Sequence, residues 1–469
     1  MITLSLAEAA QIVSGQLLDV DTAAAATDFC GVVIDSRQVR KAQLFAALPG
    51  EHTDGHEYVA LVLSQGAAVA LVATPVENAG AQIVVKDVQL ALGELAASWL
   101  ARLRAEGNLT VIALTGSNGK TTVKEMLGSV LSLQHKVLMT QGNFNNELGL
   151  PLTLFALDSD DEYAILELGA SRAGDIAYLC EICKPDIALL NNVGPAHLEG
   201  FGDLQGVALA KGEIFAGLLS GGCAIVNADE PWMALWQSQI ANAKTFSFGS
   251  KSTADVWADL STEQFNLNTG VGQINDLILP LPGQHNRMNA LAATAVLQAL
   301  TISLTEIRQG LERVSAATGR LQSSRAPGGW QVIDDTYNAN PASLYAGIAV
   351  LTEGLSVDDT AWLILGDMAE LGEDGPQLHK EMGAAARSAG ISRLYALGEQ
   401  TKFSVAGFGK NACHYANKAD LLDKLLADIH PRVTCLVKGS RSMGMEEVAN
   451  ALLQEPTAWN AANHPRETV

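Results

Sequence analysis

The segment from Leu109 to Thr122 constrains the fold and the chemistry of this chain more than any other stretch. An apolar run that includes Val111 and Ile112 predicts a buried strand, and it leads directly into Thr-Gly-Ser-Asn-Gly-Lys-Thr-Thr at 115–122. The next residues, 123–133, carry apolar side chains at helical spacing. A strand, a glycine-containing loop and a helix together surround a phosphate chain with backbone N–H groups and a helix N-terminus. The segment therefore predicts binding of a nucleoside triphosphate.

The loop also predicts how such a ligand is held. Lys120 is expected against the β and γ phosphates, and the Thr121 hydroxyl is expected to ligate Mg²⁺. Leu114 stands where the general phosphate-loop pattern has its first glycine, so an ordinary glycine-containing turn is the alternative interpretation. The residues predicted to contact the nucleotide here are Thr115, Gly116, Ser117, Asn118, Gly119, Lys120, Thr121 and Thr122.

Composition and charge exclude several classes of partner. The chain has 469 residues, 17% of them charged and 48% hydrophobic, which is typical of a globular protein with two to four domains. Its net charge of −21 argues against nucleic acid or an anionic membrane as a partner. No apolar run is long enough to span a membrane, and the first residues lack the basic region of a secretory signal. We therefore expect a cytoplasmic protein.

The cysteines fit the same compartment. Six cysteines are scattered without the spacing of a disulfide framework, as is usual in a reducing environment. Cys180 and Cys183 form the only close pair, and no second pair completes a zinc site. We predict that these two thiols belong to a helix core.

The pattern of apolar runs predicts an α/β protein with three domains. Strand-like runs alternate with helical segments in the second and third parts of the chain, which is typical of parallel sheets covered by helices. We expect a small N-terminal α/β domain over 1–86, a central phosphate-loop domain with a mainly parallel sheet over 87–316, a C-terminal Rossmann-like doubly wound domain over 317–455, and a tail over 456–469. The predicted strands are 31–34, 43–47, 69–73, 82–85, 137–140, 163–168, 187–191, 223–227, 332–334, 361–365, 394–397 and 434–437, and a long helix is predicted over 90–106.

Polar turns follow several of these strands. Ligands in parallel sheets gather at the carboxyl ends of the strands, so turn residues there are candidates for a site. Taken singly, each is ambiguous, because Glu167 suits a helix cap, His197 suits a loop and Lys211 suits a solvated helix face. Their repetition beside the phosphate loop predicts a Mg²⁺ site with oxygen ligands and one imidazole.

Four further segments identify a family resemblance. The 115–122 loop is common to all Mur ligases of bacterial peptidoglycan synthesis, and a close variant occurs in folylpolyglutamate synthetases. The segments 143–151, 192–197, 334–343 and 366–372 follow in order, and from about residue 30 to 450 the chain resembles the Mur ligases. It looks most like the members that join D-Ala-D-Ala to UDP-N-acetylmuramoyl-tripeptide.

The resemblance implies roles for individual residues. Thr121 and Glu167 would hold one Mg²⁺, while His197 and Lys211 would hold a second, with a carbamate on Lys211. Other nucleotide contacts would come from Asn286 and Asn289 at the adenine, Arg320 at the γ-phosphate and Asp335 at the ribose. The catalytic set would be Lys120, Glu167, His197, Lys211 and Arg320. Substrate contacts would come from Ser36 and Arg37 at the UDP group, and from Asn143, Asn145, Asn146, Asn338, Asp367, Lys438, Ser440 and Arg441.

The resemblance also implies the reaction. ATP would phosphorylate the peptide carboxylate to an acyl phosphate, the dipeptide amine would attack it, and ADP and phosphate would be released. Closure of the domains would bring the phosphate loop, Arg320 and Asp335 together. We expect a monomer. Two alternatives remain open from the sequence: another amide ligase on the same scaffold, such as a folylpolyglutamate synthetase, and a phosphate-loop ATPase that is not a ligase.

Overall fold

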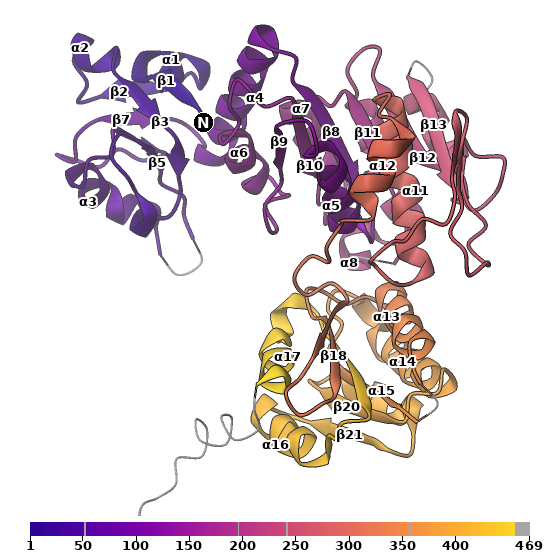
Figure 1. Ribbon diagram of the computed structural model, residues 1–469. Coiled ribbons are helices and arrows are strands. Elements are labelled where there is room, and N and C mark those ends of the chain that lie inside the picture. The colour runs from indigo at the N-terminus through magenta and orange to yellow at the C-terminus, as the bar shows by residue number, and fades with distance from the viewer. Residues whose placement is uncertain (51–52, 196, 241–242, 357, 455–469) are drawn as a thin grey trace, which may run out of the picture.

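The computed structural model describes residues 1–50, 53–195, 197–240, 243–356 and 358–454. The chain forms three α/β domains in sequence order, shown from indigo to yellow in Figure 1. The three-domain α/β fold expected from the sequence is confirmed. The predicted tail over 456–469 lies outside the described residues.

The N-terminal domain is built on a small sheet of five strands in the order β2-β7-β6-β5-β4. All four strands predicted here are present, each slightly shorter than expected. The helix α1 begins after Ser5, whose side chain accepts the N–H of Glu8 and so caps it. The elements are β1 Thr3–Ser5, α1 Leu6–Ile12, β2 Gln16–Leu18, α2 Thr22–Ala25, β3 Asp28–Cys30, β4 Val32–Val33, β5 Leu44–Ala46, α3 Val59–Ser64, β6 Val69–Val72 and β7 Gln82–Val84.

The central domain contains a sheet of nine strands in the order β16-β15-β14-β13-β12-β11-β8-β10-β9. Its first seven strands along the chain, β8 to β14, run parallel, and β15 and β16 extend the edge antiparallel. The strands are β8 Thr110–Thr115, β9 Val137–Met139, β10 Tyr163–Glu167, β11 Ile187–Leu190, β12 Cys223–Asn227, β13 Lys244–Gly249, β14 Val256–Trp257, β15 Leu267–Thr269 and β16 Gly272–Ile274. The last four were not predicted, because their short runs carry exposed and polar residues that mask the apolar pattern.

Helices cover both faces of this sheet. The elements are α4 Val88–Glu106, α5 Lys120–Leu131, α6 Gly149–Leu154, α7 Asp175–Cys183, α8 Leu198–Phe201, α9 Leu204–Ala216, α10 Met233–Ile240, α11 Gln284–Ala299 and α12 Leu304–Leu311. One core lies under α4, α7 and α9 and continues into the N-terminal domain. A second core lies under α5, α11 and α12 on the opposite face. The central and N-terminal domains therefore share buried apolar surface through α4.

The C-terminal domain is a doubly wound sheet of six strands in the order β17-β18-β22-β19-β20-β21. All strand pairs are parallel except β17 with β18. Separate cores fill the two faces. The elements are β17 Gln322–Arg325, β18 Gln331–Asp335, α13 Pro341–Glu353, β19 Thr360–Gly366, α14 Gly375–Ser388, β20 Arg393–Leu397, α15 Thr401–Phe408, β21 Ala412–Tyr415, α16 Lys418–Asp428, β22 Val433–Lys438 and α17 Glu446–Leu453.

The close cysteine pair lies in a helix, as predicted. Cys180 and Cys183 are buried on α7, and both thiols are free. Across the described ranges, no cluster of three or more His, Cys, Asp or Glu side chains is arranged as a metal site. None of the helices in these ranges has the length and apolar character needed to cross a membrane.

Candidate active site

A cavity of about 1290 Å³ lies between the central and C-terminal domains. Its walls come from the loop after β8, the turns after β9, β10 and β11, the start of α11, and the segment that leads into α13. The central-domain turns all leave the carboxyl ends of parallel strands, where such sheets collect ligands. The cavity is therefore the candidate active site.

The phosphate loop wraps around a lysine at the start of α5. Lys120 Nζ donates to the carbonyl oxygen of Gly116 at 2.7 Å, and burial lowers the pKa of Lys120 although Glu167 opposes that change. Gly119 has a φ of +79°, and a side chain there would meet Asn289 Oδ1 at 2.4 Å. Residues 117–122 line the cavity. Thr115 lies behind the loop, where its hydroxyl donates to Leu168 at 2.9 Å.

Glu167 lies next to the hydroxyl with which it was expected to share a metal. Its Oε2 accepts from Thr121 Oγ1 at 2.9 Å, and its Oε1 accepts from Asn145 Nδ2 at 3.1 Å. The backbone N–H of Glu167 donates to Thr140 Oγ1 at 3.0 Å, which fixes the end of β10. A buried carboxylate beside a hydroxyl and an amide is an oxygen-rich donor set of the kind that Mg²⁺ prefers.

Lys211, on α9, and His197, which precedes α8, line the next part of the same cavity wall. Lys211 is 2% exposed on α9, and its burial, with the charge of Lys120 nearby, lowers the pKa of its amine to about 7. Its Nζ lies 5.9 Å from the centre of the Phe201 ring. His197 directly precedes α8, and its Nδ1 lies 2.5 Å from Glu370 Oε2 of the C-terminal domain. Burial lowers the pKa of His197, and Glu370 opposes that effect.

A chain of asparagines links the phosphate loop to α11. Asn191 Nδ2 donates both to the carbonyl oxygen of Asn118 at 3.0 Å and to Asn289 Oδ1 at 2.9 Å. Asn289 Nδ2 in turn donates to Asn286 Oδ1 at 3.2 Å. Sequence reasoning selected Asn286 and Asn289 but missed Asn191. Its position directly after β11, in a polar turn facing the loop, was the signal that could have identified it.

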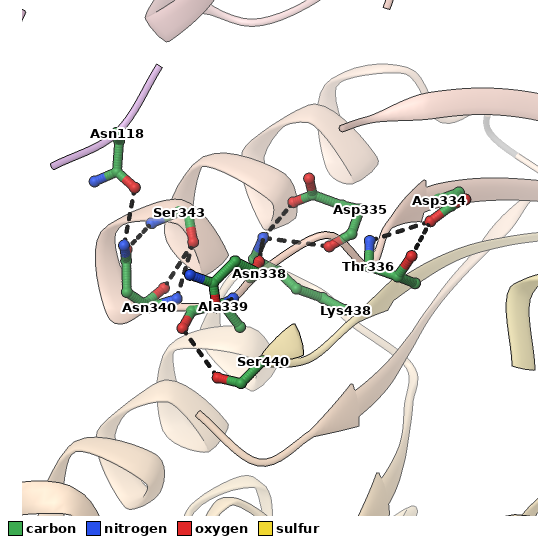
Figure 2. A network of polar contacts seen from close by, with 10 residues as sticks. All are labelled: Asn118, Asp334, Asp335, Thr336, Asn338, Ala339, Asn340, Ser343, Lys438 and Ser440. Carbon is green, nitrogen blue, oxygen red and sulfur yellow. Dashed lines mark hydrogen bonds and ion pairs between the residues drawn. The ribbon is translucent and has the colours of Figure 1, made fainter. Parts of the chain in front are cut away.

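The C-terminal domain contributes Arg320, Lys438 and the buried carboxylate of Asp335 to the cavity. The Arg320 guanidinium lies 4.2 Å from the centre of the Tyr337 ring, and its buried Nε has no hydrogen-bond partner. Asp335 ends β18 beside Lys438 of β22, and Lys438 Nζ lies 2.5 Å from Asp335 Oδ2 (Figure 2). Lys438 Nζ also donates to the carbonyl oxygen of Asn338 at 2.9 Å. Burial raises the pKa of Asp335, and Lys438 opposes the rise.

The residues predicted to contact substrate separate into two groups. Those that line the cavity are Asn143, Asn145, Asn146, Asn338, Lys438 and Arg441. Four others lie outside its lining: Ser36, Arg37, Asp367 and Ser440. Asp367 accepts the backbone N–H groups of residues 399, 400 and 401 at 2.8–2.9 Å, and Ser440 Oγ accepts that of residue 369 at 2.8 Å. These contacts give Asp367 and Ser440 a role in holding turns.

The UDP candidates lie in the N-terminal domain. Ser36 and Arg37 form a short 3-10 turn capped by Asp35, whose side chain accepts the Arg37 N–H at 3.0 Å. The Arg37 side chain is 87% exposed and also pairs with Asp35 at 2.8 Å. This turn presents an exposed cation beside the β4–β5 edge of the sheet and takes no part in the cavity lining.

Family comparisons agree with this geometry. Residues 28–99 match the model of the Mur ligase family catalytic domain, residues 114–297 match the Mur ligase middle domain, and residues 319–441 match the Mur ligase glutamate ligase domain. The chain belongs to the Mur ligase family. As a member it is an ATP-dependent ligase.

Individual relatives cover almost all of this Mur ligase. It is 40% identical over 469 residues to the UDP-N-acetylmuramoyl-tripeptide--D-alanyl-D-alanine ligase of Escherichia coli (strain K12), covering 97% of this chain and 100% of that one. The enzyme of the same name from Bacillus subtilis (strain 168) is 37% identical, covering 91% and 93%.

Solved structures show the same relation. A crystal structure of MurF from Acinetobacter baumannii superposes with a TM-score of 0.88 at 35% identity, covering 97% of this Mur ligase and 99% of that chain. MurF ligase from Thermotoga maritima in complex with ADP gives a TM-score of 0.79 at 27% identity, covering 90% and 97%. A FolC structure from E. coli shares the fold at 21% identity and a TM-score of 0.60 over 76% of this chain and 92% of that one.

Proposed function

We propose that this Mur ligase joins D-Ala-D-Ala to UDP-N-acetylmuramoyl-tripeptide and releases ADP and phosphate. The observation that carries the proposal is the cavity in which a phosphate loop and the Glu167 turn of the central domain face Arg320 and Asp335 of the C-terminal domain. Near full-length identity of 40% to a relative that bears that name supports the choice of substrates.

The cavity suits a nucleoside triphosphate bound at the phosphate loop. The loop N–H groups and the N-terminus of α5 favour binding of the phosphate chain. Lys120 adds a buried ammonium beside them. On the facing wall, the unpartnered Nε of Arg320 marks a donor available to an anion. Asn286 and Asn289 are proposed to contact the adenine, and Asp335 the ribose.

Mg²⁺ fits the donors beside this loop. Thr121 and Glu167 would hold one ion, since the Thr121 hydroxyl and the Glu167 carboxylate lie 2.9 Å apart. His197 and Lys211 would hold a second. A neutral amine reacts with CO₂ where an ammonium cannot, and burial that lowers the pKa of Lys211 to about 7 favours a carbamate there. When bound, these ions would offset negative charge on the transferring phosphoryl group.

The reaction proceeds in two steps. A terminal carboxylate oxygen of the peptide attacks the γ-phosphorus of ATP, so that a P–O bond forms, the bond to ADP breaks and an acyl phosphate results. The dipeptide amine then attacks the acyl carbon, loses a proton, and expels inorganic phosphate. Lys120 and Arg320 stabilise charge on the phosphoryl group in the first step. An acyl phosphate hydrolyses in water, so closure of the domains over the cavity would protect it.

Substrate contacts are proposed in two places, the N-terminal domain and the cavity between the other two domains. Ser36 and Arg37 would contact the UDP group, whereas Asn143, Asn145, Asn146, Asn338 and Arg441 would contact the peptide or the dipeptide within the cavity. Lys438 would affect substrate binding by positioning Asp335 and Asn338, because its ammonium already contacts both residues. Asp367 and Ser440 are proposed to act by fixing the turns that shape this wall. We propose a cytoplasmic monomer.

An acceptor-dependent phosphate assay tests the function. The purified chain is incubated with ATP, Mg²⁺ and UDP-N-acetylmuramoyl-tripeptide, and phosphate release is measured with D-Ala-D-Ala, with single amino acids, or without acceptor. A parallel reaction contains a folate and glutamate. We expect release to require D-Ala-D-Ala and the product to gain the mass of the dipeptide less water. Release without any amine would indicate a simple ATPase, and folate-dependent release would indicate the alternative ligase.

A further inference from the structure

Asn340 connects the C-terminal domain directly to the phosphate loop. Its Nδ2 donates to Asn118 Oδ1 at 2.9 Å, across 222 positions of sequence (Figure 2). In the described part of the chain, this hydrogen bond and the His197–Glu370 pair are the polar side-chain contacts that join the two domains. None of the roles proposed above for ATP or peptide binding uses Asn340.

The orientation of the Asn340 amide is set by its role as a helix cap. Asn340 is the N-cap of α13, so its Oδ1 accepts the N–H of Ser343 at 2.8 Å. Its own N–H donates to Ser343 Oγ at 3.0 Å, which completes a capping box. Because the cap requires the amide oxygen on the helix side, the NH₂ group is left facing Asn118.

Asn118 is fixed on the other side of the contact. Its N–H donates to Asn192 Oδ1 at 2.9 Å, and its carbonyl oxygen accepts from the side chains of Asn191 and Asn192, each at 3.0 Å. Its backbone is therefore held by the central domain, and its side chain is the part of the loop that reaches the C-terminal domain.

Asn340 follows a segment, residues 334–338, that is held by internal hydrogen bonds and by Lys438. Asp334 Oδ1 accepts the N–H and the hydroxyl of Thr336 at 3.1 and 2.6 Å, and Lys438 ties Asp335 to Asn338 (Figure 2). Because this segment is internally hydrogen bonded, the position of Asn340 on the loop sets the position of Asp335 in the cavity.

We propose that Asn340 is a positioning residue for the ligase reaction: its amide sets the C-terminal domain on the phosphate loop through Asn118, so that Arg320 and Asp335 face Lys120. The proposal rests on the proposed function for its activity readout. It does not require Asn340 to touch either substrate.

The test compares two helix caps in the same domain. Asn340→Ser keeps a good N-cap but has no group long enough to reach Asn118. The matched control is Asn417→Ser, because Asn417 caps α16 by accepting the N–H of Asp420 at 2.9 Å and lies outside the cavity. Thermal unfolding should shift equally in both variants. Should N340S unfold below the assay temperature, Asn340→Thr, also a capping residue, replaces it.

Two readouts decide the proposal. We expect N340S to lower kcat/KM for D-Ala-D-Ala about fivefold relative to N417S, the loss of one net hydrogen bond. In solution scattering, the radius of gyration of wild type and N417S should decrease when AMPPCP and Mg²⁺ are added. The decrease should be smaller for N340S at the same fraction of bound AMPPCP. In an Asn118→Ala background, N340S should cause no further loss.

The proposal is overturned if N340S and N417S have the same kcat/KM or the same compaction in scattering. It is also overturned if N340S lowers kcat/KM in the Asn118→Ala background by the same factor as in wild type. Failure of wild type and N417S to ligate D-Ala-D-Ala would instead refute the proposed function. The scattering comparison would then still decide the role of Asn340.

Discussion

Removing the ammonium of Lys438 should destabilise the C-terminal domain far more than removing a surface charge. The Lys438 side chain is 2% exposed, and its Nζ lies 2.5 Å from Asp335 Oδ2 because β18 and β22 pair these two residues in register. Lys438→Met preserves most of the packing of the side-chain stem. It leaves the Asp335 carboxylate buried without its cation.

The structure gives the size of this effect. At an effective dielectric of about 20, two unit charges 2.5 Å apart attract by about 7 kcal/mol. Removal of both charges from water offsets much of this attraction, so the pair adds little net stability. Loss of one partner leaves the desolvation cost of the other, which is about 3–5 kcal/mol for buried pairs. We expect K438M to lower the unfolding free energy by about 4 kcal/mol, equivalent to about 10 °C in the midpoint.

The pH dependence of this loss has a defined sign. Burial already holds the pKa of Asp335 above its ordinary value, and K438M removes the group that opposes this rise. Asp335 therefore binds a proton more readily in the folded variant than in the unfolded chain. Lowering the pH then recovers part of the unfolding free energy that the variant loses at neutral pH. The difference in unfolding free energy between K438M and wild type should shrink as the pH falls from about 7.5 toward 5.

Urea unfolding followed by circular dichroism measures these differences. The control is Lys424→Met, whose Nζ lies 2.8 Å from Asp428 Oδ1 in a pair that leaves the Lys424 side chain 52% exposed. We expect K424M to cost less than about 0.5 kcal/mol. Asp335→Asn combined with K438M should recover part of the loss, since no buried charge remains. The reasoning is refuted if K438M costs no more than K424M, or if its cost is the same at pH 5 and pH 7.5.

Three further predictions concern the cavity. Lys120→Ala should lower acceptor-dependent phosphate release by more than about a hundredfold while the circular dichroism spectrum and unfolding midpoint stay near wild type; retention of ligation would contradict the phosphate role. A crystal structure with bound nucleotide and Mg²⁺ should show electron density beyond Nζ of Lys211, and a bare lysine in a well-ordered complex would refute the carbamate. Solution scattering should show a smaller radius of gyration when ATP analogue and UDP-N-acetylmuramoyl-tripeptide are both bound, and unchanged inter-domain distances would refute closure.

The sequence predicted the central site because its signals are local. The strand, loop and helix at 109–133 are contiguous, and β8 and α5 form where the apolar pattern places them. Strand ends of a parallel sheet meet at one edge, so Glu167, His197 and Lys211 could be assigned to the same cavity from their positions in the chain. The short, polar strands β13 to β16 gave no such pattern and were missed.

Contacts between distant segments were beyond the reach of the sequence. Nothing local in Asp367 distinguishes a substrate contact from an acceptor of three backbone N–H groups, and only the fold brings residues 399–401 against it. Asn191 differs, because its place in a polar turn after a strand marks it as a candidate, but only the fold shows that its amide bridges the phosphate loop and α11.

The sequence by itself was enough to predict a triphosphate site at 115–122, because those backbone N–H groups and the lysine belong to one short segment. Tertiary structure alone decided what faces that segment. The pairing of β18 with β22 turns Lys438 toward Asp335, and the placement of the C-terminal domain brings Asn340 to Asn118 across 222 positions. Such pairs depend on strand pairing and domain packing between segments far apart in the chain, so no local sequence pattern predicts them.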